Sequence, residues 1–324
     1  MLQQIIHTPC WHSSLRDALH ELNPDKVLLL TDFNVARTVL DSVNPCLPAV
    51  ADEVAVISPG ESGKNTANLA MVWERLAGAG CTRHSLMVNL GGGVVSDLGG
   101  FAAATFKRGI RFINIPTTLL AMADAAIGGK TGIDFLGYKN EVGAFAPAER
   151  VIVDKSVLST LPDSELRSGF AEVVKMTLIT SSPVYEELLE EGALYDPEIM
   201  QRAIKLAADE KLRIVTEDPF EKGVRRMLNF GHTAGHAYES YAAATGCPIT
   251  HGEAVAHGML AALRLSCERN GYPAEKVDEY EQKILKRYYS PLPFGEEAAP
   301  EIERLMAHDK KNPAQGEVNW VLLP

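Results

Sequence analysis

The sequence has few cysteines and no long hydrophobic run. Its five cysteines are scattered through 324 residues and never form a C-x-x-C pair, which argues against a disulfide framework and a cysteine zinc site. Its apolar stretches are interrupted well before the roughly 18 residues that a membrane helix needs. The first residues, MLQQIIHTPCW, lack the basic and apolar regions of a signal peptide. We therefore expect a cytoplasmic protein that does not bind a membrane.

Positive charge is also in short supply. The chain has 31 Lys and Arg against 42 Asp and Glu, which gives a formal net charge of −11. A field of this sign repels polyanions, so nucleic acid is not an expected partner. With 46% hydrophobic and 23% charged residues, the composition is that of a globular protein, and the length allows two domains. A small anionic substrate would need cations gathered locally.

The first half of the chain alternates short apolar runs with helical patterns. Each run is continuously apolar and is followed by turn residues, a pattern that is typical of buried parallel strands. We expect strands at 26–32, 53–60, 85–93, 111–118 and 150–154, and a helix at 66–79. This alternation predicts a Rossmann-like α/β domain, a parallel sheet covered by helices on both faces, with ligands outside the carboxyl ends of the strands.

The second half is predicted to be helical. Pro162 and Asp163 are typical of a helix start, and apolar residues then recur at helical spacing. We expect helices at 164–180, 183–191, 197–216, 225–244, 252–270 and 274–288. The predicted domains are an α/β nucleotide-binding domain over residues 1–155 and an all-α metal- and substrate-binding domain over residues 156–324, with the boundary near Asp154 to Thr160.

A glycine-rich turn follows one of the predicted strands. The segment NLGGGVVSDLGGF places three glycines between a strand and a helix, where backbone N–H groups and the helix N-terminus favour a diphosphate. The spacing is not G-x-G-x-x-G, so a dinucleotide site and a tight connection stay open as interpretations. Asp32, at the end of the first predicted strand, could accept hydrogen bonds from the hydroxyl groups of a ribose. An ordinary turn aspartate is the favoured interpretation of that residue.

Several polar residues interrupt the apolar helical patterns. Left unpaired inside a helical domain they would be costly, unless they shared a ligand. Two imidazoles, one carboxylate and an open position make a catalytic zinc site. Spacing alone does not decide which two histidines bind, although His232 and His236 at i, i+4 are the simplest pair. The polar residues are Glu172 and Lys175 in GFAEVVK, His232 and His236 in NFGHTAGH, and His251, Glu253 and His257 in ITHGEAVAHGM.

Cationic residues lie in similar Gly-rich or polar contexts. An acidic protein that concentrates them near a metal is predicted to bind a small polyanion that carries phosphate and carboxylate groups. For any single one of these lysines, a solvated surface charge is the favoured interpretation. The residues are Arg108, Lys130, Lys139 with Asn140, Lys175, Lys211 and Arg225.

These segments resemble the sugar phosphate cyclases, and among them the 3-dehydroquinate synthase family. The match runs from Asp97 to Met259 almost without interruption and returns in DKKN at Asp309 to Asn312. The gap between His236 and His251 is a few residues longer than is usual in the family, which we expect to move a loop without removing a ligand. The matching segments are GGGVVSDLGGFAAATFKRG, IPTTLLAMADAAIGGKTGID, KNEVGAF, LPDSELRSGFAEVVK, RRMLNFGHTAGHAYE and HGEAVAHGM.

The resemblance implies a lyase of the shikimate pathway, in aromatic amino acid biosynthesis. The implied reaction converts 3-deoxy-D-arabino-heptulosonate 7-phosphate to 3-dehydroquinate and phosphate. Its implied course is transient oxidation by NAD, phosphate elimination, reduction and intramolecular aldol closure. The implied cofactors are NAD and Zn²⁺, with Co²⁺ as an alternative metal. The implied partners are a small phosphorylated sugar acid and a second copy of the chain in a homodimer.

The resemblance also implies roles for individual residues. It assigns the metal to Glu172, His232 and His251, which replaces the i, i+4 pair and makes His236 a proton relay. The implied catalytic set is His236, Lys130, Lys175, Lys211, Arg225, Asn229 and Glu221. The implied substrate contacts are Asp124, Arg108, Lys139, Asn140 and Lys310. The implied NAD contacts are Asp32, Glu61, Lys64, Gly92, Gly93, Asp97, Thr117, Thr118, Lys139 and Thr160.

Three other functions compete with this hypothesis. A related cyclase, such as 2-deoxy-scyllo-inosose or 2-epi-5-epi-valiolone synthase, would use another sugar phosphate. Arg225 and Asn229, placed by the resemblance to meet a substrate carboxylate, favour the sugar acid. A polyol or glycerol-phosphate dehydrogenase of the same broad fold would release NADH. An inactive nucleotide-binding module is disfavoured because it would need neither the metal ligands nor the cations.

Overall fold

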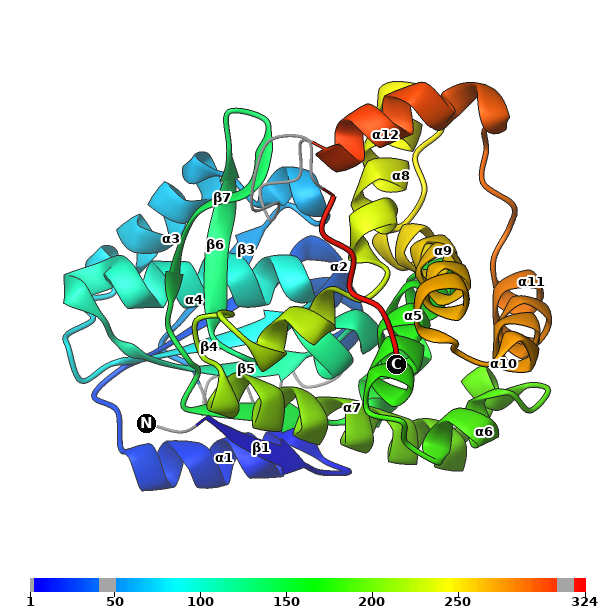
Figure 1. Ribbon diagram of the computed structural model, residues 1–324. Coiled ribbons are helices and arrows are strands. Elements are labelled where there is room, and N and C mark those ends of the chain that lie inside the picture. Colours follow the sequence, from blue (N-terminus) through cyan, green and yellow to red (C-terminus); the bar gives the residue numbers. More distant parts are fainter. Residues whose placement is uncertain (1–2, 41–50, 308–317) are drawn as a thin grey trace. The chain divides into compact units, whose positions relative to one another are not determined.

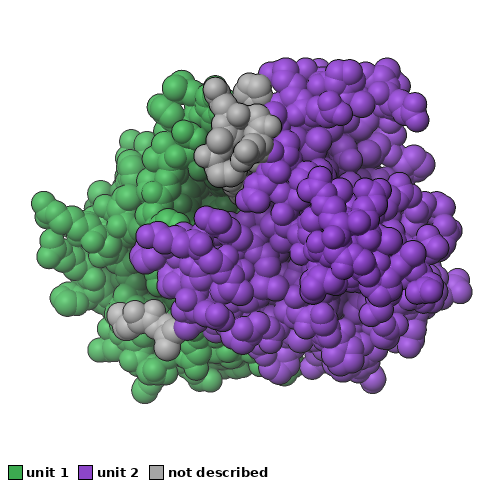
Figure 2. Space-filling model, in the orientation of Figure 1, with its two compact units in different colours: residues 1–162 green, residues 163–324 purple. Residues whose placement is uncertain are grey.

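The computed structural model describes residues 3–40, 51–307 and 318–324. The chain folds into two compact units, residues 1–162 and residues 163–324, which Figure 2 shows in different colours. The boundary predicted from the sequence lies at the start of a short 3₁₀ helix, Lys155–Thr160, which closes the first unit. Within the described ranges, every helix is too short or too polar to cross a membrane.

The first unit is built on a six-stranded parallel sheet in the order β1-β8-β5-β4-β2-β3 (Figure 1). The five predicted strands are confirmed, and β1 is an addition that its short, half-exposed sequence QIIH did not reveal. β2 and β4 are fully or almost fully buried, which explains their continuous apolar sequences. The strands are β1 (Gln4–His7), β2 (Val27–Asp32), β3 (Glu53–Ile57), β4 (Leu86–Gly91), β5 (Arg111–Pro116) and β8 (Arg150–Val153).

Helices and one hairpin connect these strands. α4 packs against β2, β4 and β5, and α3 packs against β3 and α4. The antiparallel hairpin of β6 and β7 lies outside the main sheet and contacts α4. The helices are α1 (Trp11–Leu22), α2 (Phe33–Val35), α3 (Thr66–Gly78) and α4 (Gly93–Thr105), with short π and 3₁₀ turns at Ala36–Leu40, Glu61–Gly63, Phe106–Arg108, Ala121–Ala125 and Lys155–Thr160. The hairpin strands are β6 (Lys130–Phe135) and β7 (Tyr138–Phe145).

The strand order creates a switch point between β2 and β4. The chain leaves β2 toward β3 on one side and leaves β4 toward β5 on the other. In open parallel sheets, a crevice that accepts ligands forms outside the carboxyl ends of the two strands at such a point. Asp32 ends β2, and Gly92 and Gly93 follow β4. The fold therefore places the glycine-rich turn at this crevice.

The second unit is helical, as predicted. The correction concerns the helix expected at 225–244, which is wrong over its first seven residues. Residues 224–229 form a 3₁₀ helix, Gly231 adopts φ 78°, and the α-helix begins only at His232. A side chain at Gly231 would overlap Met259, and glycine also avoids the steric cost of this left-handed backbone. The helices are α5 (Asp163–Ile179), α6 (Val184–Leu188), α7 (Pro197–Glu217), α8 (His232–Ala244), α9 (His251–Asn270), α10 (Ala274–Glu279), α11 (Lys286–Tyr288) and α12 (Ala299–Ala307), with short turns at Ala193–Tyr195, Val224–Asn229, Tyr280–Leu285 and Glu296–Ala298.

Glycines bring three of these helices close together. A Cβ at Gly252 of α9 would overlap the carbonyl oxygen of Ser168 on α5. A Cβ at Gly258 would overlap the carbonyl oxygen of Gly231, just before α8. Side chains at these positions would push α9 away from its neighbours, because packed helices cannot overlap. The start of α9, with His251, is thus held against α5 and α8.

We predict that Gly252→Ala lowers the free energy of unfolding by about 1–3 kcal/mol or more, because the added methyl group overpacks the contact between α9 and α5. Gly78→Ala is the matched control, since a Cβ at this helical position meets nothing within 4 Å. The control is expected to be neutral or stabilising by about 0.5–1 kcal/mol. Urea unfolding of both variants measures the effects. Equal stabilities would contradict the close approach at Gly252.

Candidate active site

A buried ion pair lies at the centre of the helical unit. Glu172 and Lys175 are one turn apart on α5, and each side chain is 1% exposed. Helix α5 is buried from Ser168 to Ile179, so both charges lie within the core. Burying charge is costly unless it is paired. Glu172 and Lys175 do form an ion pair, yet among the described residues none donates a hydrogen bond of ordinary geometry to either carboxylate oxygen of Glu172.

Two imidazoles from the other helices point at this carboxylate. The Nε2 atom of His232, the first residue of α8, lies 3.5 Å from Oε1 of Glu172. The Nε2 atom of His251, the first residue of α9, lies 3.4 Å from the same oxygen. The close approach of the helices at Gly252 and Gly258 therefore brings three possible ligand groups together.

Hydrogen bonds on the far side of each ring determine which nitrogen faces Glu172 with a lone pair. Nδ1 of His232 lies 3.1 Å from the carbonyl oxygen of Phe230, and Nδ1 of His251 lies 3.2 Å from Oε2 of Glu239. A carbonyl or a carboxylate can only accept, so Nδ1 of each ring must donate. The neutral form of each histidine then directs an unprotonated Nε2 toward Glu172.

The donor set fits a divalent cation. Ligand atoms of Glu172, His232 and His251 all lie within 4.8 Å of one another. In a tetrahedral site with bonds of about 2.0–2.2 Å, donor atoms are roughly 3.3–3.6 Å apart, which matches the two Nε2 to Oε1 distances. Three facing acceptors repel one another unless a cation or protons lie between them. Two imidazoles and a carboxylate leave a fourth position open for a substrate.

Electrostatics favour the same conclusion. Burial raises the pKa of Glu172, but the positive charge of Lys175 and the contact with His251 outweigh it and lower the pKa. Burial lowers the pKa of His251, but contacts with Glu172 and Glu239 raise it to about 9. The carboxylate is therefore ionised at neutral pH and attracts positive charge into the site, as a proton or as a metal ion.

Two other candidate metal ligands, His236 and His257, lie outside the group of Glu172, His232 and His251. The ring of His236 is 5.2 Å from that of His232 and 6.0 Å from that of His251, centroid to centroid, but its nitrogens do not belong to the ligand cluster found among the described residues. Nε2 of His257 contacts the carbonyl oxygen of Ser290 at 2.8 Å. The structure thus favours Glu172, His232 and His251 over the i, i+4 pair.

Further polar groups lie on elements next to α5. Lys211 on α7 and Arg225 in the 3₁₀ turn 224–229 are buried, and both elements pack against α5 and each other. The side-chain amide of Asn229 donates to Glu221 at 2.6 Å. Asp218 accepts from three backbone N–H groups and so shapes the loop that carries Glu221 and Arg225. Two of the predicted cations, Lys211 and Arg225, therefore lie in the same unit as the group of Glu172, His232 and His251.

The glycine turn of the first unit is suited to close approach by a ligand. Gly92 precedes α4 at the carboxyl end of β4, and a Cβ there would lie 2.9 Å from the methyl group of Thr118. The hydroxyl of Thr117 is buried, and its oxygen has no hydrogen-bond partner among the described residues. The N-terminus of α4 is half-buried at Gly92 and Gly93, and together with the Thr117 hydroxyl it fits a dinucleotide phosphate.

Three residues with different predicted roles meet beside this turn. The ammonium of buried Lys64 lies 2.5 Å from Oδ2 of Asp97 and 2.5 Å from Oδ1 of Asn140. Burial lowers the pKa of Lys64, but the charges of Asp97, Glu61 and Asp134 outweigh it and raise the pKa. The structure thus joins predicted NAD contacts, Lys64 and Asp97, to a predicted substrate contact, Asn140.

Asp32 ends β2, and the remaining predicted residues of this unit lie in turns or at the starts of helices and strands. Asp32 uses Oδ1 to accept from the backbone of Asn34 and Val35 at 2.8 and 3.0 Å, so it caps α2 as a turn aspartate does. Its predicted ribose contact would use the other oxygen. The others are Glu61 in the turn 61–63, Gly93 at the start of α4, Asp124 in the turn 121–125, Lys130 and Lys139 at the starts of β6 and β7, and Thr160 at the end of the turn 155–160.

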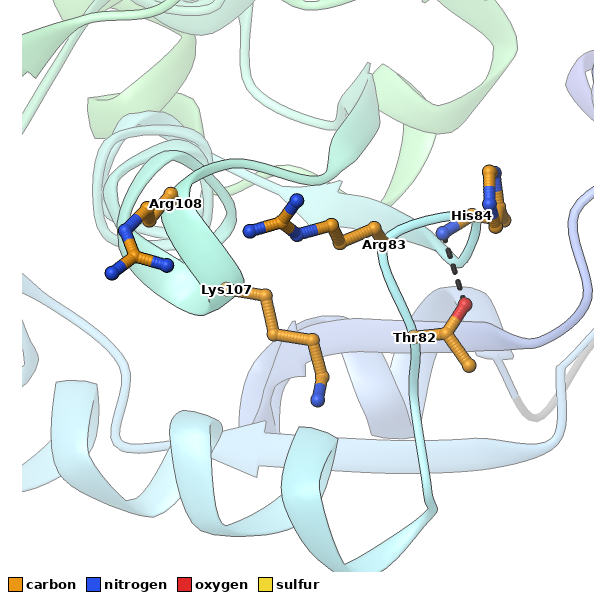
Figure 3. A pocket seen from close by; sticks show the side chains of 5 residues that line it. All are labelled: Thr82, Arg83, His84, Lys107 and Arg108. Atoms are coloured by element: carbon orange, nitrogen blue, oxygen red, sulfur yellow. Dashed lines mark hydrogen bonds between the residues drawn. The ribbon is translucent and has the colours of Figure 1, made fainter.

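Arg108 lies at the opposite edge of the same sheet. It belongs to the turn between α4 and β5, next to the amino ends of β4 and β5. Together with Thr82, Arg83, His84 and Lys107 it lines an open pocket of about 490 Å³ (Figure 3). Lys107 and Arg108 both have positive φ, 50° and 66°, a conformation that is unusual for residues other than glycine. Lys310 falls outside the described residues.

Motif analysis missed one polar residue of the site. Glu239 lies seven residues after His232 on α8, and its carboxylate contacts His251. Its spacing places it on the same helical face as His232. That spacing was the only available signal, because a glutamate on a helix is usually a solvated surface charge.

Comparison with known proteins identifies the family. The model of the 3-dehydroquinate synthase N-terminal domain matches residues 54–168, and that of the C-terminal domain matches residues 169–312. A 3-dehydroquinate synthase of Parabacteroides distasonis is 42% identical over 99% of this chain and 91% of that protein. One from Rhodopirellula baltica is 38% identical over 91% of this chain and 80% of that protein.

Solved structures share the fold. A 2-deoxy-scyllo-inosose synthase, complexed with carbaglucose-6-phosphate, NAD⁺ and Co²⁺, aligns with a TM-score of 0.85 and 26% identity over 98% of this chain and 88% of that chain. A 2-epi-5-epi-valiolone synthase from Streptomyces hygroscopicus, with NAD⁺ and Zn²⁺ bound, aligns with a TM-score of 0.81 and 24% identity over 95% of this chain and 86% of that chain.

The cluster predicts different effects for two neighbouring histidines. His251→Ala should lose bound zinc, falling from about one ion per chain toward none after dialysis, because it removes one of three ligands. His236→Ala should keep the ion. Elemental analysis of both purified variants measures the zinc content. Loss of zinc from His236→Ala together with its retention in His251→Ala would instead favour His232 and His236 as the ligating pair.

Proposed function

This chain belongs to the 3-dehydroquinate synthase family, and on that premise we propose that it converts 3-deoxy-D-arabino-heptulosonate 7-phosphate to 3-dehydroquinate and phosphate. The observation that carries the proposal is the buried Glu172 carboxylate faced by the Nε2 atoms of His232 and His251. The glycine turn at the sheet's switch point supports it independently. The proposed cofactors are NAD and Zn²⁺, with Co²⁺ as an alternative metal.

The proposed site divides the chemistry among groups of residues. Glu172, His232 and His251 would hold the metal, while Gly92, Gly93 and Thr117 are among those that would hold NAD. When bound, the metal supplies a Lewis acid beside the substrate hydroxyls and NAD supplies a reversible hydride acceptor. The chain's own residues then have to bind, orient and balance the charge of a substrate with a phosphate and a carboxylate.

Buried cations suit that task. Lys175 and Lys211 lie in a low-dielectric interior, where they stabilise the charge of a leaving phosphate more strongly than they would in water. The guanidinium of Arg225 and the amide of Asn229 provide the donors that a substrate carboxylate accepts. His236, beside the two ligating rings, is the proposed proton relay. Lys130, Lys139, Asn140, Asp124 and Glu221 are the remaining proposed contacts of the sugar acid, together with Lys310.

The rival functions have less support. The 2-deoxy-scyllo-inosose and 2-epi-5-epi-valiolone synthases described above are 26% and 24% identical to this chain, whereas the 3-dehydroquinate synthase of Parabacteroides distasonis is 42% identical. Arg225 and Asn229 also favour a substrate that has a carboxylate. A dehydrogenase that releases NADH would not need the buried cations of a phosphate-eliminating site.

We predict that the zinc-loaded protein releases inorganic phosphate from the heptulosonate phosphate with only catalytic amounts of NAD, because the net reaction consumes no oxidant. Phosphate release is measured colorimetrically, beside sugar phosphates that lack the carboxylate, while absorbance at 340 nm is followed. Removal of the metal should abolish release, and zinc should restore it. Steady growth of NADH, or full activity after chelation, would contradict the proposal.

Arg108 lies at the far end of α4 from the glycine turn. Helix α4 runs from the glycine turn to the turn that carries Arg108, and 13 residues of helix span about 20 Å at 1.5 Å per residue. Arg108 therefore does not reach a substrate that reacts beside NAD in its own copy. We propose that it serves the active site of a second copy in a homodimer, which also accounts for its exposure at the rim of the pocket in Figure 3.

Complementation tests this assignment. Arg108→Ala and Glu172→Gln should each be inactive alone, because one lacks the donated cation and the other a metal ligand. Randomly mixed dimers should recover about a quarter of wild-type activity, since half of them hold one intact site of two. Each variant refolded alone is the control. No recovery in verified mixed dimers would mean that Arg108 acts within its own copy or not at all.

Location in the cytoplasm and the domain boundary between residues 155 and 156 stay predictions. The wide scatter of the cysteines is compatible with a reducing compartment.

A further inference from the structure

We propose that Glu239 is a positioning residue of the metal site, which holds His251 in the orientation and tautomer that bind the cation. This inference rests on the proposed metal site at Glu172, His232 and His251. It assigns a role to a residue that no motif singled out, and it concerns a side chain that does not itself touch the metal.

His251 bridges two carboxylates through its two ring nitrogens. Nδ1 lies 3.2 Å from Oε2 of Glu239, and Nε2 lies 3.4 Å from Oε1 of Glu172. The side chains of Glu239 and His251 are 18% and 30% exposed, so the contact is partly shielded from water. Because Glu239 lies on the far side of the imidazole, it is absent from the ligand cluster found among the described residues. It therefore acts on the metal through His251.

The two ligating histidines are held in different ways. His232 donates to the carbonyl oxygen of Phe230, two residues before it, so the local backbone fixes that ring. His251 follows the loop 245–250, and its Nδ1 atom donates to the side chain of Glu239 on another helix, α8. Among the described residues, Glu239 provides the acceptor within hydrogen-bond distance of Nδ1 of His251. Without this acceptor the ring is free to turn or to present the wrong nitrogen.

The charge of Glu239 also matters. His232 and His251 are the first residues of α8 and α9, and the positive end of a helix dipole disfavours a nearby cation. Glu239 supplies a second negative charge beside the site, in addition to Glu172, whose charge Lys175 already balances. A carboxylate that accepts from a metal-binding histidine makes the ligating nitrogen more basic.

Three substitutions separate these effects. Glu239→Ala and Glu239→Met remove the acceptor, and methionine nearly preserves the side-chain volume. Glu239→Gln keeps an acceptor but removes the charge. Glu268→Gln is the matched control, because Glu268 is an exposed residue of the helix that carries His251. Circular dichroism and thermal unfolding in the presence of chelator establish that each metal-free variant is folded.

The readout is the zinc Kd, measured by competition with a chromophoric chelator. We expect Glu239→Ala and Glu239→Met to weaken zinc binding by about 10–100-fold and Glu239→Gln to weaken it less. The visible spectrum of the Co²⁺-loaded protein should change in the same order, while the control keeps both the wild-type Kd and the wild-type spectrum. A residue with a purely structural role would alter thermal unfolding but not these two quantities.

The outcomes distinguish the inference from its premise. If the wild-type protein binds no zinc, the proposed metal site fails. If the wild type binds zinc and a folded Ala or Met variant binds it within about twofold of the wild-type Kd, Glu239 has no positioning role, although the site itself stands. Equal weakening in the Glu268→Gln control would also overturn the proposal.

Discussion

The buried carboxylate of Glu172 is the constraint on which the helical unit depends. It is ionised in the core, paired with Lys175 on the same helix, and faced by one imidazole from α8 and one from α9. Losing one partner of such a buried pair costs about 3–5 kcal/mol, because the remaining charge is left uncompensated. An arrangement this costly is explained by a ligand that needs it, and a divalent cation satisfies all three acceptors at once.

The rest of the structure serves to bring those groups together. Glycines at positions 252 and 258 let the start of α9 approach α5 and the residue before α8, so the proposed ligands, which are distant in sequence, converge. In the other unit, parallel strands bring their carboxyl ends to one edge, where Gly92 and Thr117 lie beside the switch point. Each unit thus provides a part of the chemistry through backbone geometry, and the side chains complete it.

Much of this could be predicted from the sequence, for reasons that differ between features. Continuous apolar runs such as VLLLTD revealed the buried strands, because both of their faces are covered. The i, i+4 spacing favoured His232 and His236 as the metal-binding pair, whereas the structure favours His232 and His251. Local spacing does not reveal this pair, because it depends on a tertiary contact between α8 and α9. Helical periodicity also continues through Gly231, and it reveals neither the left-handed conformation of this glycine nor its close approach to Met259. The contact between Glu239 and His251 is likewise a tertiary contact, which local spacing does not reveal.

The central claim is that Glu172, His232 and His251 share one metal ion. Crystals of the zinc-loaded protein, measured at and below the zinc absorption edge, locate that ion directly by anomalous scattering. The account predicts one strong peak at about 2.0–2.2 Å from Nε2 of His232, Nε2 of His251 and a carboxylate oxygen of Glu172. A peak bound by His236 in place of His251, or no peak among these three side chains, would contradict it.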